Sequence, residues 1–579
     1  MLSNSQRREP HGWGVAIENT NNVGPKPFDS IWEKDSRIVI GIDIGSTQSG
    51  VAVTFLQKAF GAEVEEVMDD ADGHESGLAK RFKLHMHPSE MREKYSIKLD
   101  PLPNGVTLPQ IYADFMNYLF KNTEPFFKDR IVDGPTIWEA YKDSINFVIA
   151  HPNGWSIREQ EFLRRAAVDG GLVRTIDAKM RVRFVTEAEA SVHYCISHSN
   201  ISNRLRTGLN FAVCDAGGST VDTTVYTVTS ISPLLKLAEK RDSACIQAGG
   251  LYVDDAVQKY LGDTLTRAGI DPEDIEEYVE EGVKDFEKFP KRLFSDGSDS
   301  LKLKLGDKAL TNSEINVRRG VMTVPSPTPK WFFDHCVKAI IKSVDDQIRG
   351  INVSHILLVG GFGDSPYLQQ QLKERYNPLG SQLTTANDST SKAVAEGAIM
   401  WNTMTSVFSR APNWSYGIQG YVRFDSYSSD HRERTTFTTP DGYEKVTGVW
   451  CEIVKKVKFC AEIYFSEYLP TYSTPKPNLE SIEIALYSYS GNDQPKWLRT
   501  KNGSLLKGFE NVCLITADLR SLSGALEPKI GPRGTYWGLL FYVCVRFGDT
   551  EISAYLEWEE DGETRFGPIS IVPQEVNWA

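Results

Sequence analysis

The chain has 579 residues, of which 40% are hydrophobic and 24% are charged, and its formal net charge is −13. This length exceeds what a single hydrophobic core serves, so several domains are expected in an otherwise ordinary globular composition. The acidic excess argues against nucleic acid or an anionic membrane surface as the main partner, because a basic stripe is lacking.

The sequence contains no run of about 18 apolar residues, so no membrane span is expected. Its first residues lack the apolar core of a signal peptide. Eight cysteines without a CxxC pair indicate mostly buried thiols in a reducing compartment. We therefore expect a cytoplasmic protein, with the nucleus left open.

The N-terminal part begins with a polar segment, residues 1–35, which lacks periodicity and predicts a flexible tail. Two apolar runs, Ile38–Ile42 and Val51–Phe55, flank a turn of small residues and predict a strand–turn–strand unit. Apolar residues between Ile111 and Phe120 recur at helical spacing. The segment INFVIAHP, residues 145–152, predicts a buried strand.

Strands and helices continue to alternate along the chain. Ser156 and Glu159 form a capping box, which predicts the start of a helix. A second strand–turn–strand unit follows at FAVCDAGGSTVDTTVY, residues 211–226, and HILLVGG, residues 355–361, predicts a strand before a further helix. Beyond residue 409, alternating apolar and polar runs separated by turn residues predict an all-β module, a sandwich of antiparallel strands.

Two short segments repeat one layout, VIGIDIGSTQSGVAV and FAVCDAGGSTVDTTV. Each places an aspartate, Asp43 or Asp215, at a strand end beside a glycine turn whose backbone amides can bind an anion. Carboxylates there would repel a bare phosphate, so the combination favours a divalent cation between them. The pair of turns predicts a binding site for a magnesium–nucleotide complex, with the polyphosphate between the two turns. The strand, glycine pair and helix start at Val359–Pro366 predict a third contact, with the sugar or base.

These motifs resemble the actin-like ATPase superfamily, and within it the heat-shock protein 70 family. GIDIGSTQSGVAV and CDAGGSTVDTTVY are similar to its two phosphate motifs, ILLVGGFGDSPYL to its adenosine motif, and VTEAEASVHY to its first connecting motif. The spacing, the KLHMH segment and the β-rich C-terminus are most similar to the divergent heat-shock protein 12 subgroup and its fungal relatives. The match extends over residues 38–403.

The resemblance implies an α/β fold: a duplicated ribonuclease-H-like (actin-like) two-lobed ATPase domain followed by a β-rich module. The implied boundaries are 1–35 for the tail, 36–205 for lobe I, 206–408 for lobe II and 409–579 for the module that binds a substrate or partner. ATP or ADP and Mg²⁺ are the implied cofactors.

The resemblance also assigns roles to individual residues. The implied catalytic residues are Lys83, Glu187, Asp215 and Thr220. The residues implied to orient the water shell of Mg²⁺ are Asp43, Asp215 and Asp222. The residues implied to bind nucleotide are Gly45, Ser46, Thr47, Gln48, Gly217, Gly218, Ser219, Thr220, Lys291, Arg292, Gly360 and Gly361. For the lysine, Lys98 is an alternative to Lys83, and a solvated lysine is an open interpretation of either.

Several positions depart from the family pattern. Gln48 and Ser219 are mild changes, whereas Phe362 and Asp364 replace a serine and an arginine near the adenine, and Ser391 replaces an aspartate. The acidic, leucine-rich linker that couples nucleotide state to peptide binding is replaced by MTSVFSRAPNW, residues 404–414. The changes near the adenine affect the expected nucleotide affinity.

The implied function is slow, Mg²⁺-dependent ATP hydrolysis coupled to an unidentified protein or peptide client, with cochaperones as further partners. Two alternatives stay open: a small-molecule kinase on the same fold, and a nucleotide-binding scaffold with little turnover. His85 and His87 alternate as on a strand, and because no third ligand is nearby, we expect ordinary core or surface packing rather than metal binding.

Overall fold

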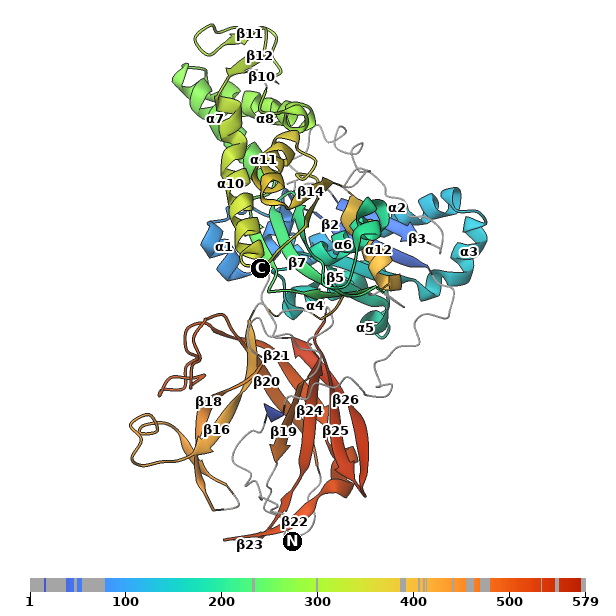
Figure 1. The fold of residues 1–579 in the computed structure, drawn as a ribbon, viewed down its shortest axis with the longest axis vertical. Coiled ribbons are helices and arrows are strands. Elements are labelled where there is room, and N and C mark those ends of the chain that lie inside the picture. The colour runs from blue at the N-terminus through green and yellow to red at the C-terminus, as the bar shows by residue number, and fades with distance from the viewer. Residues whose placement is uncertain are drawn as a thin grey trace. The chain divides into compact units, whose positions relative to one another are not determined.

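The computed structural model describes residues 15–16, 38–45, 49–54, 79–231, 235–297, 300–385, 392–404, 407–409, 412, 414–439, 442–454, 463–468, 479–532, 534–546 and 551–573. The fold is mixed α/β and divides into two compact units, residues 32–407 and residues 408–577, with residues 1–31 assigned to the second. Figure 1 shows helices and sheets in the first unit and mainly strands in the second.

The first unit alternates strands and helices along most of its length. Its helices are η1 (Phe82–Met86), α1 (Ser89–Tyr95), α2 (Leu108–Arg130), α3 (Gly134–Tyr141), η2 (Lys142–Ser144), α4 (Ile157–Asp169), α5 (Ala178–Arg181), α6 (Glu187–His198), η3 (Asn200–Arg204), α7 (Leu251–Arg267), α8 (Pro272–Lys288), α9 (Pro290–Leu293), α10 (Thr328–Ile348), α11 (Pro366–Tyr376), η4 (Asn377–Leu379) and α12 (Ala393–Met404). Its strands are β2 (Val39–Ile44), β3 (Ser49–Thr54), β4 (Asn146–His151), β5 (Val182–Thr186), β6 (Asn210–Ala216), β7 (Thr220–Ser230), β8 (Lys236–Glu239), β9 (Ala244–Gln247), β10 (Ser300–Lys304), β11 (Val317–Arg318), β12 (Val321–Pro325), β13 (His355–Val359), β14 (Gln382–Thr385) and β15 (Val407–Ser409).

Two sheets lie at the centre of this unit, and four neighbouring strands of the larger sheet, which continues from β7 to β8, β9 and β15, repeat the strand order of the smaller one. In the first, β2 pairs antiparallel with β3 and parallel with β4, and β4 pairs parallel with β5. In the second, β6 pairs antiparallel with β7 and parallel with β13, and β13 pairs parallel with β14. Each sheet therefore places the first strand of a hairpin between its hairpin partner and a parallel strand. Both predicted strand–turn–strand units are confirmed.

Sequence signals at the helix ends are also confirmed. Ser156 and Glu159 form the capping box of α4, with the Ser156 N–H donating to Glu159 Oε2 at 2.7 Å. The predicted helix at Ile111–Phe120 is part of the longer α2. All six residues of β4 are buried, as expected of a parallel strand with both faces covered.

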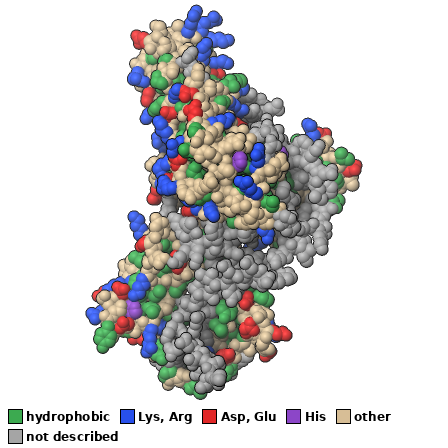
Figure 2. Space-filling model, viewed as in Figure 1, with side chains coloured by type: hydrophobic (Ala, Val, Ile, Leu, Met, Phe, Trp, Pro, Cys, Tyr) green, Lys and Arg blue, Asp and Glu red, His purple; other side chains and the backbone are tan. Residues whose placement is uncertain are grey.

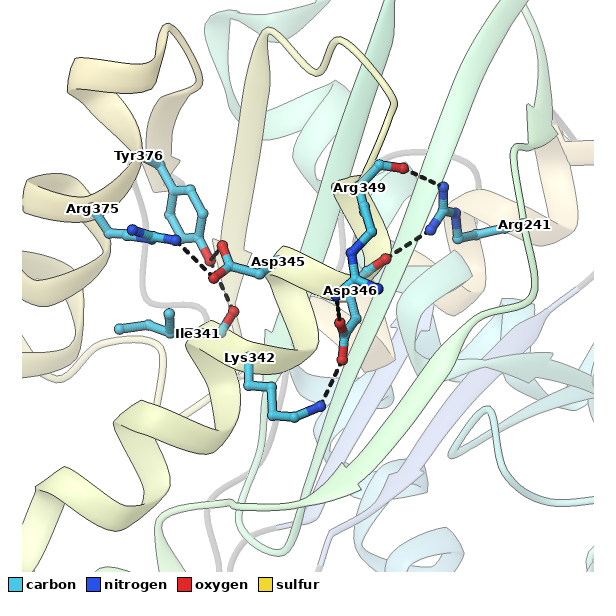
Figure 3. Close-up of polar contacts among 8 residues, drawn as sticks. All are labelled: Arg241, Ile341, Lys342, Asp345, Asp346, Arg349, Arg375 and Tyr376. Atoms are coloured by element: carbon cyan, nitrogen blue, oxygen red, sulfur yellow. Dashed lines mark hydrogen bonds and ion pairs between the residues drawn. The ribbon is translucent and has the colours of Figure 1, made fainter.

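Side chains around the C-terminal end of α10 fix it to its neighbours (Figure 3). The Arg241 guanidinium donates to the backbone oxygens of Asp346 and Arg349 at 2.7 and 2.8 Å. The Tyr376 hydroxyl of α11 donates to the Asp345 carboxylate at 3.1 Å. Because the last carbonyls of a helix lack intrahelical partners, Arg241 satisfies two groups that would otherwise need solvent.

A small sheet, β10-β12-β11, lies beyond α7 and α8 in Figure 1. Its strand β10 alternates buried Leu301 and Leu303 with exposed Lys302 and Lys304, so one face packs inward and the other meets solvent. Figure 2 shows lysine and arginine side chains gathered over this end of the unit. The protein thus carries a local basic surface despite its net negative charge.

The second unit is built from antiparallel strands. They are β1 (Val15–Ala16), β16 (Ser415–Arg423), β17 (Thr436–Thr438), β18 (Glu444–Val454), β19 (Ile463–Tyr468), β20 (Ser481–Tyr489), β21 (Phe509–Asp518), β22 (Glu527–Gly531), β23 (Gly534–Gly538), β24 (Leu540–Arg546), β25 (Ser553–Glu560) and β26 (Glu563–Pro573). Ten of them follow the order β1-β19-β24-β25-β26-β21-β20-β16-β18-β17, and β22 pairs with β23. The β-rich character is confirmed, and the part of this unit that the structure describes contains no α-helix.

The predicted N-terminal tail, residues 1–35, falls almost wholly outside the described residues. Within it the structure describes only Val15–Ala16, which form strand β1 and pair antiparallel with β19. These two residues therefore have a partner in the β-rich unit.

Candidate functional site

The aspartates of the two repeated segments occupy matching places in the two sheets. Asp43 lies in β2 beside Ala150 of the parallel strand β4. Asp215 lies in β6 beside Val359 of the parallel strand β13. In the β6–β7 hairpin, Asp215 is also directly opposite Asp222. The register thus explains why two aspartates seven positions apart in sequence lie side by side.

The glycine turn between β6 and β7 is held by the start of α7. The backbone N–H groups of Gly249, Gly250 and Leu251 donate to the carbonyls of Ser219, Gly217 and Gly218 at 3.0, 3.1 and 2.8 Å. A Cβ at Gly249 would fall 2.3 Å from the Gly218 oxygen, so only glycine permits this approach. The carbonyl groups of the Gly217–Ser219 turn therefore accept hydrogen bonds from the start of α7, and these bonds fix the conformation of the turn that is predicted to bind phosphate.

A buried ion pair links η1 to the start of α6. The Lys83 ammonium lies 2.7 Å from Glu187 Oε1, and the two residues are only 4% and 7% exposed. In η1, the neighbouring Leu84 and Met86 are buried in the core, which fixes the short helix that carries Lys83. Lys98, the alternative lysine, is exposed and outside this pair. Of the two candidate lysines, Lys83 therefore lies in the buried ion pair and Lys98 does not.

Three aspartates share the electrostatic environment of this pair. Burial, followed by the negative charge of Glu187, raises the pKa of Asp43, Asp215 and Asp222 to about 7 in each case. The charge of Lys83 acts in the opposite direction on all three. Since these groups influence one another, the structure brings together carboxylates from both central sheets around one lysine.

Specific donors hold two of the aspartates. The Ser191 hydroxyl of α6 donates to Asp215 Oδ2 at 2.6 Å, and the Asn153 backbone N–H donates to Asp222 Oδ1 at 3.1 Å. Gly360 follows β13 with a φ of +85°, and a Cβ there would fall 2.4 Å from Asp215 Oδ1. Ser191 and Asn153 were not among the predicted site residues, although Ser191 lies within the connecting motif VTEAEASVHY and Asn153 directly follows INFVIAHP.

Of the two basic residues predicted to flank the adenine, Lys291 contacts α7 and Arg292 does not. Lys291 forms an ion pair of 2.6 Å with Asp254 of α7, beside Gly250, where a Cβ would lie 3.2 Å from Lys291 Nζ. Burial raises the pKa of Asp254 to about 8, although the Lys291 charge lowers it. Phe362 is buried in the hydrophobic core and is also next to Gly250. Arg292 is exposed on α9 and makes no part of this contact.

Several predictions cannot be placed. Ser46, Thr47 and Gln48 of the first turn, and Ser391, lie outside the described residues. Gly45 is described and partly buried, and the second turn, with buried Ser219 and Thr220, is described in full. The interpretation of His85 and His87 as strand residues was wrong, because the segment forms the 3-10 helix η1 and His87 follows it.

Direct metal binding by protein side chains has no support in the described part of the chain. There, no group of three or more His, Cys, Asp or Glu residues has the arrangement needed to hold an ion. A cation at the aspartates would therefore need water and ligand oxygens in its coordination shell, as Mg²⁺ usually has. In the described residues, no helix has the length and apolar character needed to cross a membrane.

Comparisons with known proteins leave the family open. No protein-family model matches the sequence. No curated protein matches it significantly.

Proposed function

We propose that the chain is a Mg²⁺-dependent, ATP-binding protein of the heat-shock protein 70 type, which hydrolyses ATP slowly. The proposed fold of the first unit is a duplicated, actin-like pair of lobes. Two features support it: the strand order that the smaller central sheet shares with four strands of the larger one, and the matching places of Asp43 and Asp215 within these strands.

The observation that carries the proposal is the cluster of Lys83, Glu187 and the three aspartates, in which only Asp43 is partly exposed. Four carboxyl groups with one lysine leave an excess of negative charge, and burial makes that charge costly. The raised pKa values of the aspartates express this cost. A divalent cation would relieve it, so the residues present fit a bound magnesium ion.

In this proposal Asp43, Asp215 and Asp222 would hold the hydrated Mg²⁺ of a metal–ATP complex. When bound, the metal supplies positive charge that neutralises the polyphosphate and the developing charge on the transferred group. The backbone of Gly45 and of the Gly217–Thr220 turn would bind the phosphates from opposite sides. The family resemblance, rather than any contact, assigns ATP as the ligand.

Lys83 and Glu187 then have complementary roles. The Lys83 ammonium would stabilise negative charge on the transferred phosphoryl group, since phosphoryl transfer depends mainly on positioning and electrostatics. A Glu187 carboxylate oxygen would accept a hydrogen bond from the attacking water and orient it. Burial of both side chains keeps bulk water away, which strengthens these interactions.

The β-rich unit is proposed to bind a protein or peptide client, with cochaperones as additional partners and the cytoplasm as the location. Its support is the antiparallel sheet after the first unit, in the place of the family's substrate module. The resemblance implies that the nucleotide controls this unit, although residues 404–414 replace the linker that the family uses for this coupling.

The direct test is phosphate release by the purified full-length chain with Mg²⁺ and ATP. We expect slow release by the wild type, strong loss in Lys83→Ala and Asp215→Asn, and no loss in Lys98→Ala, the matched exposed lysine. Release that needs an added sugar or polyol would instead support the kinase. Binding without release would support the scaffold, and unchanged turnover in Asp215→Asn would contradict the metal assignment.

A further inference from the structure

The loop between β4 and α4, residues 152–156, contacts the site from the side of the first sheet. Its Asn153 N–H donates to Asp222 across a separation of 69 residues, at 3.1 Å. Its Trp155 is 6% exposed and lies in the hydrophobic core of this part of the unit. One short loop therefore contacts the second sheet's aspartate and, through Trp155, the segment that carries Lys83.

Trp155 lies next to Lys83. His87 contacts the edge of the indole ring, and His151 stacks on the indole. The Lys83 ammonium is 5.8 Å from the centroid of the Trp155 ring, within the range of a cation–π interaction. The indole Nε1–H donates to His87 Nδ1 at 3.1 Å. The His151 ring is stacked parallel to the indole, with 6.4 Å between centroids and 4° between planes.

His87 completes the connection to the second sheet. Burial, with the nearby charges of Lys83 and Arg92, lowers the pKa of His87 to about 3, so its ring is neutral and Nδ1 can accept. Its Nε2 lies 3.5 Å from the Gln247 side-chain nitrogen, a packing contact because both nitrogens carry hydrogens when Nδ1 accepts, and Gln247 is directly opposite Thr220 in the β7–β9 pairing. His87, which follows the helix that carries Lys83, thus contacts Gln247 of β9, the strand paired with the end of the glycine turn.

We propose that Trp155 and His87 are positioning residues for Lys83. The hydrogen bond between them fixes the indole, and the indole limits where the Lys83 ammonium can lie beside Glu187. This inference rests on the proposed ATP hydrolysis, because it concerns the lysine assigned to the transferred phosphoryl group. It assigns no contact with nucleotide to Trp155 or His87.

The kinetic test compares variants that keep or remove the hydrogen bond between Trp155 and His87. Trp155→Phe removes the donor and keeps an aromatic ring, and His87→Leu removes the acceptor. We expect each to lower kcat for phosphate release about tenfold while KM for ATP changes less than about twofold, because a small misplacement lowers the rate of chemistry more than binding. The double variant should be no slower than either single variant.

Two controls separate positioning from general stability. His87→Asn keeps an acceptor close to the position of Nδ1 and should retain most of the wild-type kcat. Trp138→Phe alters another buried tryptophan, in the α2–α3 core, and should lower stability without changing kcat. A fall in kcat for Trp138→Phe equal to that for Trp155→Phe would contradict the proposal, as would wild-type kcat in His87→Leu.

A second measurement keeps the inference testable if the wild type does not release phosphate. In the nucleotide-free chain, reductive methylation followed by mass spectrometry reports the accessibility of Lys83, with exposed Lys98 as the internal reference. We expect Lys83 to react several-fold faster in Trp155→Phe and His87→Leu than in the wild type or Trp138→Phe. Equal rates would overturn the positioning role, whereas absent phosphate release alone would overturn only the proposed hydrolysis.

Discussion

Lys83 Nζ lies 2.7 Å from Glu187 Oε1, and the two buried residues are separated by 104 positions in the sequence. The pair connects the short helix η1 to the first turn of α6, where the positive end of the helix dipole also favours a carboxylate. Neither side chain can be removed alone without leaving a buried charge that its partner no longer balances.

Removing the lysine should therefore destabilise the fold as well as the site. Lys83→Met leaves Glu187 buried without its cation, and we expect a loss of about 3 kcal/mol in the free energy of unfolding at pH 8. The double variant Lys83→Met/Glu187→Gln should recover much of that loss. Urea unfolding measures the free energy of unfolding of both variants, with Lys98→Met as the exposed control. If the loss in the double variant equals the sum of the losses in Lys83→Met and Glu187→Gln, the two side chains do not interact directly.

The aspartates should make stability depend on pH in a defined direction. A carboxyl group with a pKa of 3.8 when unfolded and about 7 when folded binds more protons in the folded state between these values, so stability falls as pH rises from about 4 to 7. Asp215→Asn removes one such group. It should stabilise the ligand-free protein by about 1–3 kcal/mol at pH 8, with the gain vanishing near pH 4.

The control for this effect is Asp346→Asn, a partly exposed carboxylate whose pKa is lowered by its hydrogen bond with Lys342 and by the nearby charge of Arg349. It should not stabilise the protein at pH 8. Urea unfolding across the pH range measures both variants. A gain for Asp215→Asn that is independent of pH would show that the Asp215 charge is not the cause.

Gly360 offers a matched test of the close contact between β13 and β6. Gly360 and Gly380 both have positive φ angles, +85° and +88°, but a Cβ at Gly360 would meet the Ala216 and Asp215 oxygens, whereas nothing lies within 4 Å at Gly380. Gly380→Ala should cost about 1 kcal/mol from backbone strain alone. Gly360→Ala should cost several times more in thermal unfolding, and equal costs would disprove the contact.

Binding of Mg²⁺ and ATP should release protons. At pH 7 the aspartates, with pKa values of about 7, are partly protonated in the ligand-free protein, and a nearby cation favours their ionised form. Calorimetric titration in buffers of different ionisation enthalpy should show net release at pH 7 and less at pH 9. Proton uptake at pH 7 would contradict the raised pKa values.

The sequence predicted the local parts of this architecture well. The capping box of α4, the strand of INFVIAHP and both hairpins follow from short-range patterns, and the structure confirms them. The ion pair of Lys83 and Glu187 could not be derived from spacing, because it depends on how the fold brings η1 to the first residue of α6. Only the family resemblance indicated those two residues.

Other parts of the site were not accessible from the sequence. The roles of Trp155 and His87 depend on a hydrogen bond between residues 68 positions apart, which no local pattern encodes. The sequence predicted a strand at His85 and His87, whereas the segment forms the 3-10 helix η1. A segment this short takes its conformation from tertiary packing, which the local pattern does not show. The glycine-rich turn at Gly217 was predictable, since close backbone approach restricts such positions to small residues.

Calorimetric titration of the full-length chain with ATP, with and without Mg²⁺, tests the central claim most directly. The claim is that Asp43, Asp215, Asp222 and the two glycine turns form one site for a metal–nucleotide complex. We predict binding that requires Mg²⁺ in the wild type and is much weaker in Asp215→Asn, with Asp346→Asn unchanged. ATP binding of equal strength with and without Mg²⁺, or no binding at all, would contradict the claim.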